Sequence, residues 1–268
     1  MQIIKEIIDH SGQLRRKGSW LKPAGFVSAH PSFESAMPHL MLNDTQIRSL
    51  LADPDRVPSR QTYDVTWILN QGQYGSCNPT ATAGALSRAR YRRGLSKLLF
   101  SGAFLYSLIN GGRDQGSALE DAMNAVMQYG IAPLSMVPPN DIYTYLIPAG
   151  AKAEAFKHRG LKAFAVGTQQ GLRSALAAQI PCVTAIEAGN NYANATDGFP
   201  AVDSGPGDHA VCADDLCLID GKEYFDSPGS WGGRFGVNGR QYLTWEHYRQ
   251  TFPNHTFFAI ASTDEAEE

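Results

Sequence analysis

A cysteine in a glycine-rich loop is the residue of this sequence best placed to do chemistry. Cys77 ends the run Gln71-Gly72-Gln73-Tyr74-Gly75-Ser76-Cys77, and Asn78-Pro79 and an alanine-rich stretch follow it. This order predicts that the thiol lies at the start of a helix, where the helix dipole favours the thiolate. Gln71 lies just upstream and can donate a hydrogen bond from its side-chain amide. The loop therefore predicts a nucleophile.

A thiolate used in acyl transfer needs an acid/base partner, and His209 has the most suggestive surroundings of the seven histidines. A glycine-rich segment, residues 204–208, leads into it and an apolar run follows it, so we expect His209 at the mouth of a strand. Asp226 ends the next apolar run. On a neighbouring strand its carboxylate could orient the imidazole and favour the imidazolium. We therefore predict Cys77, His209 and Asp226 as the catalytic group.

The elements that position these residues change character along the chain. Helical spacing is found at residues 79–93, 101–110, 118–129 and 170–179. β-like runs are found at 63–69, before the cysteine, and later at 181–187, 209–218, 223–226, 241–244 and 256–260. A helical first half followed by a strand-rich second half predicts an α+β fold with two lobes.

Three parts of the chain are expected. Residues 1–57 are broken by glycine and proline and hold one amphipathic stretch at 44–51, which predicts an extended arm that docks on a partner or acts as a pro-segment. Residues 58–262 form the domain, with a mainly helical lobe to residue 165 and a mainly β lobe from residue 166. Residues 263–268 are expected to be a solvated acidic tail.

Composition narrows the class of protein. The 268 residues are 43% hydrophobic and 18% charged with a net charge of -3, which is typical of a globular domain without a nucleic-acid surface. The first ten residues lack the apolar core of a secretory signal, and no run could span a bilayer, so no membrane partner is expected. The four cysteines fit neither a disulfide framework nor a zinc site, and we expect no metal or other cofactor. The cytoplasm or the inside of a virus particle is the expected location.

Five segments resemble the papain-like cysteine peptidase family, and they occur in the family's order. They are residues 70–77, 104–106 with 115–117, 128–131, 208–211 and 226–232. The resemblance spans roughly residue 58 to the last strand and looks closer to bacterial or phage-borne members than to secreted or lysosomal ones. It implies a helical N-terminal lobe, an antiparallel β-barrel-like C-terminal lobe and an active-site cleft between them.

The resemblance also implies a role for each matching residue. Cys77 would be the nucleophile and His209 its acid/base partner, while the Gln71 side chain and the Cys77 N–H would form an oxyanion hole. Residues 115–117 look like the family's loop that binds the substrate main chain. The implied substrate-binding residues are Gly116, Ser117, Asp208 and Trp231.

The sequence departs from the family pattern at three places. Asn78 follows the nucleophile where the family usually has tryptophan, and Tyr74 replaces a disulfide cysteine of secreted members. The usual asparagine of the third catalytic position is missing. One alignment puts Asp226 there, whereas an alignment without a gap through Ser230-Trp231-Gly232 puts Gly229 there. We prefer Asp226, because a glycine cannot orient a histidine.

Two functions from different classes follow. The first is a cysteine hydrolase that cleaves peptide or amide bonds in a peptide or protein, with short bacterial cell-wall peptides and the chain's own arm among the candidate substrates. The alternative is a papain-fold structural or binding subunit of a larger assembly, such as a virus particle, with little or no activity. A third hypothesis places residues 1–57 in the cleft as an inhibitory segment.

Overall fold

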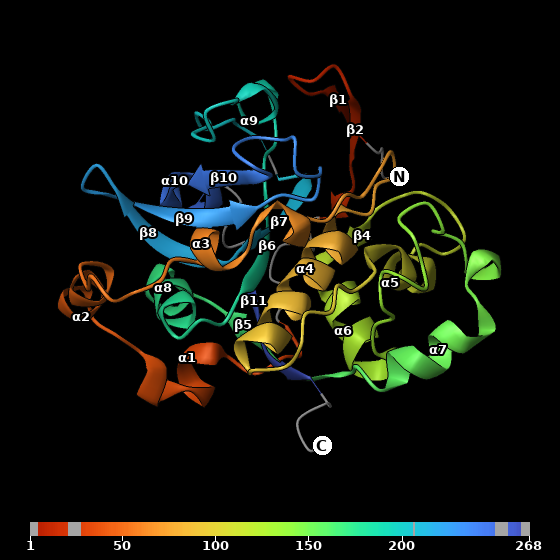
Figure 1. The fold of residues 1–268 in the computed structure, drawn as a ribbon, viewed down its shortest axis with the longest axis horizontal. Helices are drawn as coiled ribbons and strands as arrows, with labels where there is room; N and C mark the ends of the chain where they lie inside the picture. The colour runs from red at the N-terminus through yellow and green to blue at the C-terminus, as the bar shows by residue number, and fades with distance from the viewer. Residues whose placement is uncertain (1–4, 21–27, 206, 250–256, 264–268) are drawn as a thin grey trace.

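One long helix separates two lobes of the molecule (Figure 1). The structure, a computed structural model, describes residues 5–20, 28–205, 207–249 and 257–263. Helix α4 (Cys77–Arg92) packs on α5 (Gly102–Ile109) on one side and on the strands of the second lobe on the other. Helices α6 (Leu119–Tyr129) and α7 (Ala149–Phe156) complete the helical lobe. Helix α4 is buried from Cys77 to Arg90. Many of its residues are small, so α5 and the strands of the second lobe can pack closely against it.

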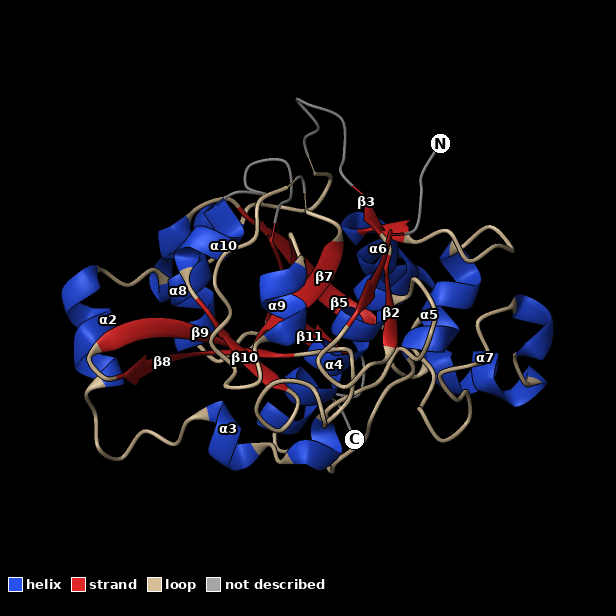
Figure 2. Ribbon diagram, turned by 90° about the horizontal axis from the view of Figure 1, so that it is seen from above, coloured by secondary structure: helices blue, strands red, loops and turns tan. Residues whose placement is uncertain are grey.

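The strands of the second lobe form two antiparallel sheets. The larger has the order β5-β11-β6-β7, with β5 at Gly160–Val166, β11 at Phe257–Thr263, β6 at Cys182–Ile186 and β7 at His209–Ala213. The smaller has the order β10-β9-β8, with β8 at Asp215–Ile219, β9 at Lys222–Pro228 and β10 at Arg240–Leu243. Within the described residues β7 and β8 belong to separate sheets, so the expected barrel-like lobe is not a closed barrel. Figure 2 shows β8, β9 and β10 on the side of the molecule away from α5, α6 and α7.

The arm is more structured than the expected extended chain. β1 (Lys5–Ile8) and β2 (Leu14–Lys17) form a hairpin, and β3 (Ser19–Trp20) pairs with β4 (Ser117–Ala118) of the helical lobe. Helices α1 (Phe33–Ala36) and α2 (Asp44–Leu51) lie beside the β lobe (Figure 1). Phe33 and Ile47 are fully buried in the core of that lobe. Residues 28–57 are therefore part of the folded body.

Most expected elements are present with shifted ends, but the single run expected at 209–218 is divided into β7 and β8 of separate sheets, and one further run is not a strand. Residues 63–69 do not form a strand, because the Asp64 side chain accepts the backbone N–H of Thr66 and starts a 3-10 helix at Val65–Trp67. The sequence did not predict α7, β5 or the short helices α3 (Ser59–Thr62), α9 (Asn190–Asn194) and α10 (Trp245–Arg249), whereas α8 (Gln169–Ala177) was expected. Thr263 ends β11, and the rest of the expected acidic tail lies outside the described residues. Within the described parts of the chain, no helix has the length and apolar character to cross a membrane.

Candidate active site

Cys77 is the first residue of α4, as the loop sequence predicts. Its side chain is fully buried, and the Ala210 backbone N–H donates to its sulfur over 3.4 Å. The Gly18 backbone N–H also hydrogen-bonds to this sulfur, and burial raises the pKa of the thiol. Because Ala210 directly follows His209, this contact brings the cysteine and the start of β7 together. The thiol is thus enclosed, in surroundings that disfavour its ionised form.

His209 begins β7, as expected, and pairs with Ile186 of β6. Its ring lies against Trp231, with 4.6 Å between ring centroids, and against Tyr192 at 5.6 Å. Neither ring nitrogen has a hydrogen-bond partner among the described residues. Burial lowers the pKa of His209 to about 3, so the imidazole is neutral here. Trp231, predicted to bind substrate, is itself 1% exposed and covers the ring from solvent.

The buried imidazole predicts an acid-sensitive fold. The charged groups that act on His209 are Asp208, Lys17 and Arg15. Its pKa is lower in the folded than in the unfolded chain, where it is about 6.5, so its contribution to stability is complete above pH 6.5 and is lost as the pH falls towards 3. We expect the free energy of unfolding of the wild type to fall relative to that of His209→Gln by up to about 1.4 kcal/mol per pH unit. Urea unfolding of both proteins between pH 7 and 4 measures this, and parallel curves would contradict it.

Three hydrogen bonds fix the orientation of the Gln71 side chain. Its Oε1 accepts from the Ser230 hydroxyl over 2.6 Å, which identifies Nε2 as the donor end of the amide. Nε2 then donates to the carbonyl oxygens of Tyr74 and Arg16, at 2.7 and 2.8 Å. The predicted donor, Gln71, is thus fixed by Ser230, the residue before Trp231. Its amide already donates to the backbone carbonyl of Arg16.

Asn78, the departure from the family pattern, supports the predicted substrate loop. Its Nδ2 donates to the Ser117 hydroxyl at 3.0 Å and to the Ala118 carbonyl at 2.7 Å. The Gly116 N–H donates to the Tyr106 hydroxyl at 2.7 Å. These contacts leave the Ser117 backbone N–H directed at another chain segment, which is the arm. An asparagine directly after Cys77, in a helix that is buried along its length, is the sequence signal for this support.

The arm lies along the whole site. The Arg16 carbonyl accepts from Gln71, and the Gly18 carbonyl accepts from the Ser117 N–H over 2.8 Å. β3 continues this contact as a parallel pair with β4. Asp208, predicted to bind substrate, is ion-paired with Lys17 and with Lys5 of the arm, each at 3.0 Å. Ser117 and Asp208, two of the predicted substrate-binding residues, therefore contact the arm directly.

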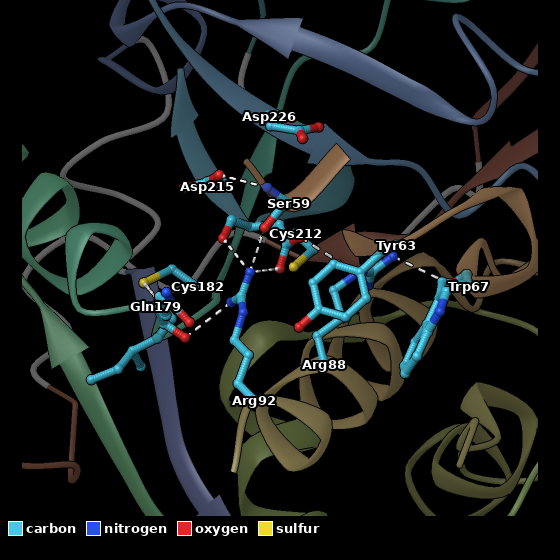
Figure 3. A network of polar contacts seen from close by, with 12 residues as sticks. Ser59, Tyr63, Trp67, Arg88, Arg92, Gln179, Cys182, Cys212, Asp215 and Asp226 are labelled. Carbon is cyan, nitrogen blue, oxygen red and sulfur yellow. Dashed lines mark hydrogen bonds and ion pairs between the residues drawn. The ribbon is translucent and has the colours of Figure 1, made fainter. Parts of the chain in front are cut away.

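Asp226 is not brought to His209. Both of its carboxylate oxygens accept from Arg240 Nη1 at 2.8 Å, and the two residues lie on the adjacent strands β9 and β10. In Figure 3, Asp226 lies above the contact between Asp215 and Ser59, and Arg88 and Arg92 lie below that contact. Asp226 on β9 is the cross-strand neighbour of Asp215 on β8, so it lies in a group of charged residues that includes Asp215 and Arg240. The predicted orienting role is thus corrected: Asp226 is the partner of a buried arginine, and in this structure it does not contact the histidine.

The gapless alternative does not supply a third side chain either. Gly229 donates its backbone N–H to Gly239 over 2.8 Å, and a Cβ at this position would meet Phe235. Among the described residues, the rings of Tyr192 and Trp231 pack against the His209 ring. Aromatic packing therefore positions the imidazole here.

The Asp226–Arg240 pair should matter for stability rather than for chemistry. Arg240→Met leaves a buried carboxylate unpaired, so we expect the free energy of unfolding to fall by about 3–5 kcal/mol. Replacing both residues, with Asp226→Leu and Arg240→Met together, should restore most of this loss. Urea denaturation of the single and double variants measures both values. A double variant that is stable but unable to react at Cys77 would return Asp226 to the catalytic group.

Comparison with known proteins points to one family. A model of the papain family of cysteine proteases matches residues 53–252. Cathepsin K of Mus musculus is 26% identical over 195 residues, which cover 69% of this chain and 58% of that protein, so the chain matches only part of the relative's length.

Solved structures agree on the fold. Xylellain, a cysteine protease from Xylella fastidiosa, superposes with a TM-score of 0.67 at 20% identity, covering 92% of this chain and 97% of the other. The Amb a 11 cysteine protease, a ragweed pollen allergen, in its proform has a TM-score of 0.65 at 25% identity, covering 78% of this chain and 66% of the other. The two-lobed architecture is therefore shared.

Proposed function

Because the chain belongs to the papain family of cysteine proteases, we propose that it hydrolyses peptide bonds through a thioester on Cys77. One observation carries the proposal. The Cys77 sulfur lies at the start of α4 and accepts a hydrogen bond from the residue that follows His209. A nucleophile at a helix N-terminus beside a histidine is the arrangement that acyl transfer requires. The family match favours this function over a purely structural subunit.

A residue of the chain can be assigned to each step of this reaction. The Cys77 thiolate attacks the carbonyl carbon of the scissile bond, and the oxygen that becomes negative is stabilised by the Gln71 amide and the Cys77 N–H. His209 gives a proton to the leaving amine, and the C–N bond breaks to leave a thioester. His209 next takes a proton from water, which attacks the thioester carbon. The C–S bond then breaks, the acid leaves, and Cys77 is released as the thiolate.

The arm would hold the enzyme in a resting state. The Arg16 carbonyl of the arm accepts a hydrogen bond from the Gln71 amide, which the reaction needs for the oxyanion. The Gly18 N–H donates to the Cys77 sulfur, and the Gly18 carbonyl accepts from the Ser117 N–H. A bound arm also keeps Cys77 and His209 buried, which favours a neutral pair over the reactive ion pair. The ragweed protease was solved in a proform. We therefore assign residues 5–20 as an inhibitory segment of this chain.

Covalent labelling tests the function. A thiol-directed epoxide should add once to the protein, at Cys77, when a variant of the arm leaves the cleft open. Cys182, Cys212 and Cys217 are free but almost fully buried, and they serve as internal controls. Peptide mapping after labelling gives the site. Labelling at one of these three residues instead of Cys77, or no turnover of any peptide in a broad library, would argue against the hydrolase.

A further inference from the structure

A lysine side chain of the arm is buried beside the catalytic residues. The side chain of Lys17 is only 6% exposed. Its ammonium donates to the Ala188 carbonyl at 2.8 Å, lies 3.0 Å from Asp208 Oδ2 and is 3.9 Å from Glu187 Oε1. Two oxygens, of Ala188 and Asp208, are thus within hydrogen-bond distance of the ammonium, and the Glu187 carboxylate adds a longer ion pair. The group thus forms a pocket that encloses a lysine.

The strand that begins with His209 and its neighbour β6 supply the acidic residues. Glu187 follows β6 directly and Asp208 precedes β7 directly, and these strands are paired at Ile186 and His209. The backbone N–H of Gly207 donates to the Glu187 carboxylate over 3.2 Å and holds it in place. The acidic pair therefore has a fixed position at the ends of neighbouring strands, next to the imidazole.

The charge of the pocket requires a cation. Asp208 is 7% exposed, and its Oδ2 lies 3.0 Å from the ammonium groups of both Lys17 and Lys5, so these two ion pairs compensate its buried charge. Burial and the neighbouring Asp208 raise the pKa of Glu187, which shows that the two acids oppose each other's charge. If the arm leaves, an apolar occupant would leave these carboxylates desolvated and unpaired.

The pocket is also adjacent to the reacting atoms. The two chain neighbours of Lys17 contact the site residues. The Arg16 carbonyl accepts a hydrogen bond from the Gln71 amide, and the Gly18 N–H donates one to the Cys77 sulfur. A residue whose side chain enters this pocket therefore has its backbone at the nucleophile. The same must hold for a substrate residue next to the bond that is cut.

We propose that Asp208, Glu187 and the Ala188 carbonyl form a lysine-binding subsite, and that the enzyme cleaves peptides with a lysine next to the scissile bond. This inference rests on the proposed peptidase function. The arm blocks the site by presenting the side chain that the subsite selects. Arginine fits less well, because its planar guanidinium does not match oxygens that surround a point charge.

The first experiment empties the pocket in the full-length chain. Lys17→Met removes the ammonium and keeps a straight side chain, so we expect alkylation of Cys77 by iodoacetamide to become at least about tenfold faster. Lys5→Met is the matched control, because Lys5 pairs with the same Asp208 oxygen but its side chain is 47% exposed. It should change the rate less. Equal rates of Cys77 alkylation in the two variants would show that the buried Lys17 side chain does not hold the arm in place, and would refute the lysine-binding pocket.

The second experiment asks whether substrates use the pocket. The Lys17→Met protein is given peptides that differ only by lysine or norleucine on either side of the scissile bond. We expect kcat/KM to favour one lysine peptide by at least about tenfold, and we expect Asp208→Asn in the same protein to abolish the preference. Equal cleavage of lysine and norleucine peptides would refute the subsite while leaving the peptidase function intact.

A binding measurement separates the two proposals. Cys77→Ala is added to the Lys17→Met chain, and fluorescence anisotropy follows the binding of the same two peptides. Preferential binding of the lysine peptide, without turnover by the Cys77 protein, would support the subsite and refute the hydrolase. Equal binding of both peptides would refute the subsite.

Discussion

Cys77→Ala should abolish peptide hydrolysis. Removal of the nucleophile of a hydrolase that works through a covalent intermediate lowers kcat by about 10⁵–10⁶, because no other group can form the acyl-enzyme. The sulfur is held by the Ala210 N–H beside the His209 strand, and no second cysteine lies at this position in the described structure. Initial rates on a fluorogenic peptide, measured in an arm-open background, give the loss.

The control for this substitution is Cys217→Ala. Cys217 lies on β8, where its sulfur contacts the Tyr224 carbonyl, and it is absent from the cleft. This variant should keep its rate within a factor of a few. Hydrolysis that survives Cys77→Ala in a preparation free of other proteases would show that a different nucleophile acts, and the proposed mechanism would then be wrong.

Gly18→Leu should open the site. A Cβ at residue 18 would lie 2.5 Å from the Gly75 carbonyl oxygen and 2.8 Å from the Gly116 Cα. Both are backbone atoms of the cleft and cannot turn away, so the bound arm loses stability relative to the released arm. A penalty of about 3 kcal/mol corresponds to about a hundredfold change in the bound fraction. We expect Cys77 alkylation and peptide hydrolysis to rise by about that factor.

The matched control for Gly18 lies in the same arm. Gly12 has φ 76° in the β1–β2 hairpin turn, and a Cβ there meets nothing within 4 Å. Asparagine tolerates such a conformation, so Gly12→Asn should leave the alkylation rate close to that of the wild type. If Gly18→Leu remains as unreactive as this control, the arm does not shield the thiol, and the inhibitory role fails.

Most positions of the candidate site could be predicted from local sequence. A loop that places Cys77 at a helix start, and a glycine-rich lead into the strand of His209, depend on residues close together in the chain, so spacing alone predicted both positions. The family's order of motifs placed Gln71 and the Gly116–Ser117 loop. The run at 63–69 was misassigned for the same local reason, because one side-chain cap outweighed its β-like composition.

The partners of buried charges could not be predicted from spacing. Asp226 looked free to orient a histidine, but the register of β9 with β10 brings Arg240 to it, and a buried carboxylate stays with the nearest cation.

The sequence by itself determined the fold class and predicted the positions of Cys77 at a helix start and His209 at a strand start, because each depends on short-range periodicity or on a motif. Only the tertiary structure decided that the arm enters the cleft, that Lys17 meets Asp208 and Glu187, and that Asp226 serves a different partner. These contacts join segments far apart in the chain. Their energy comes from burying charge against charge, which exists only after the lobes and the arm have packed together.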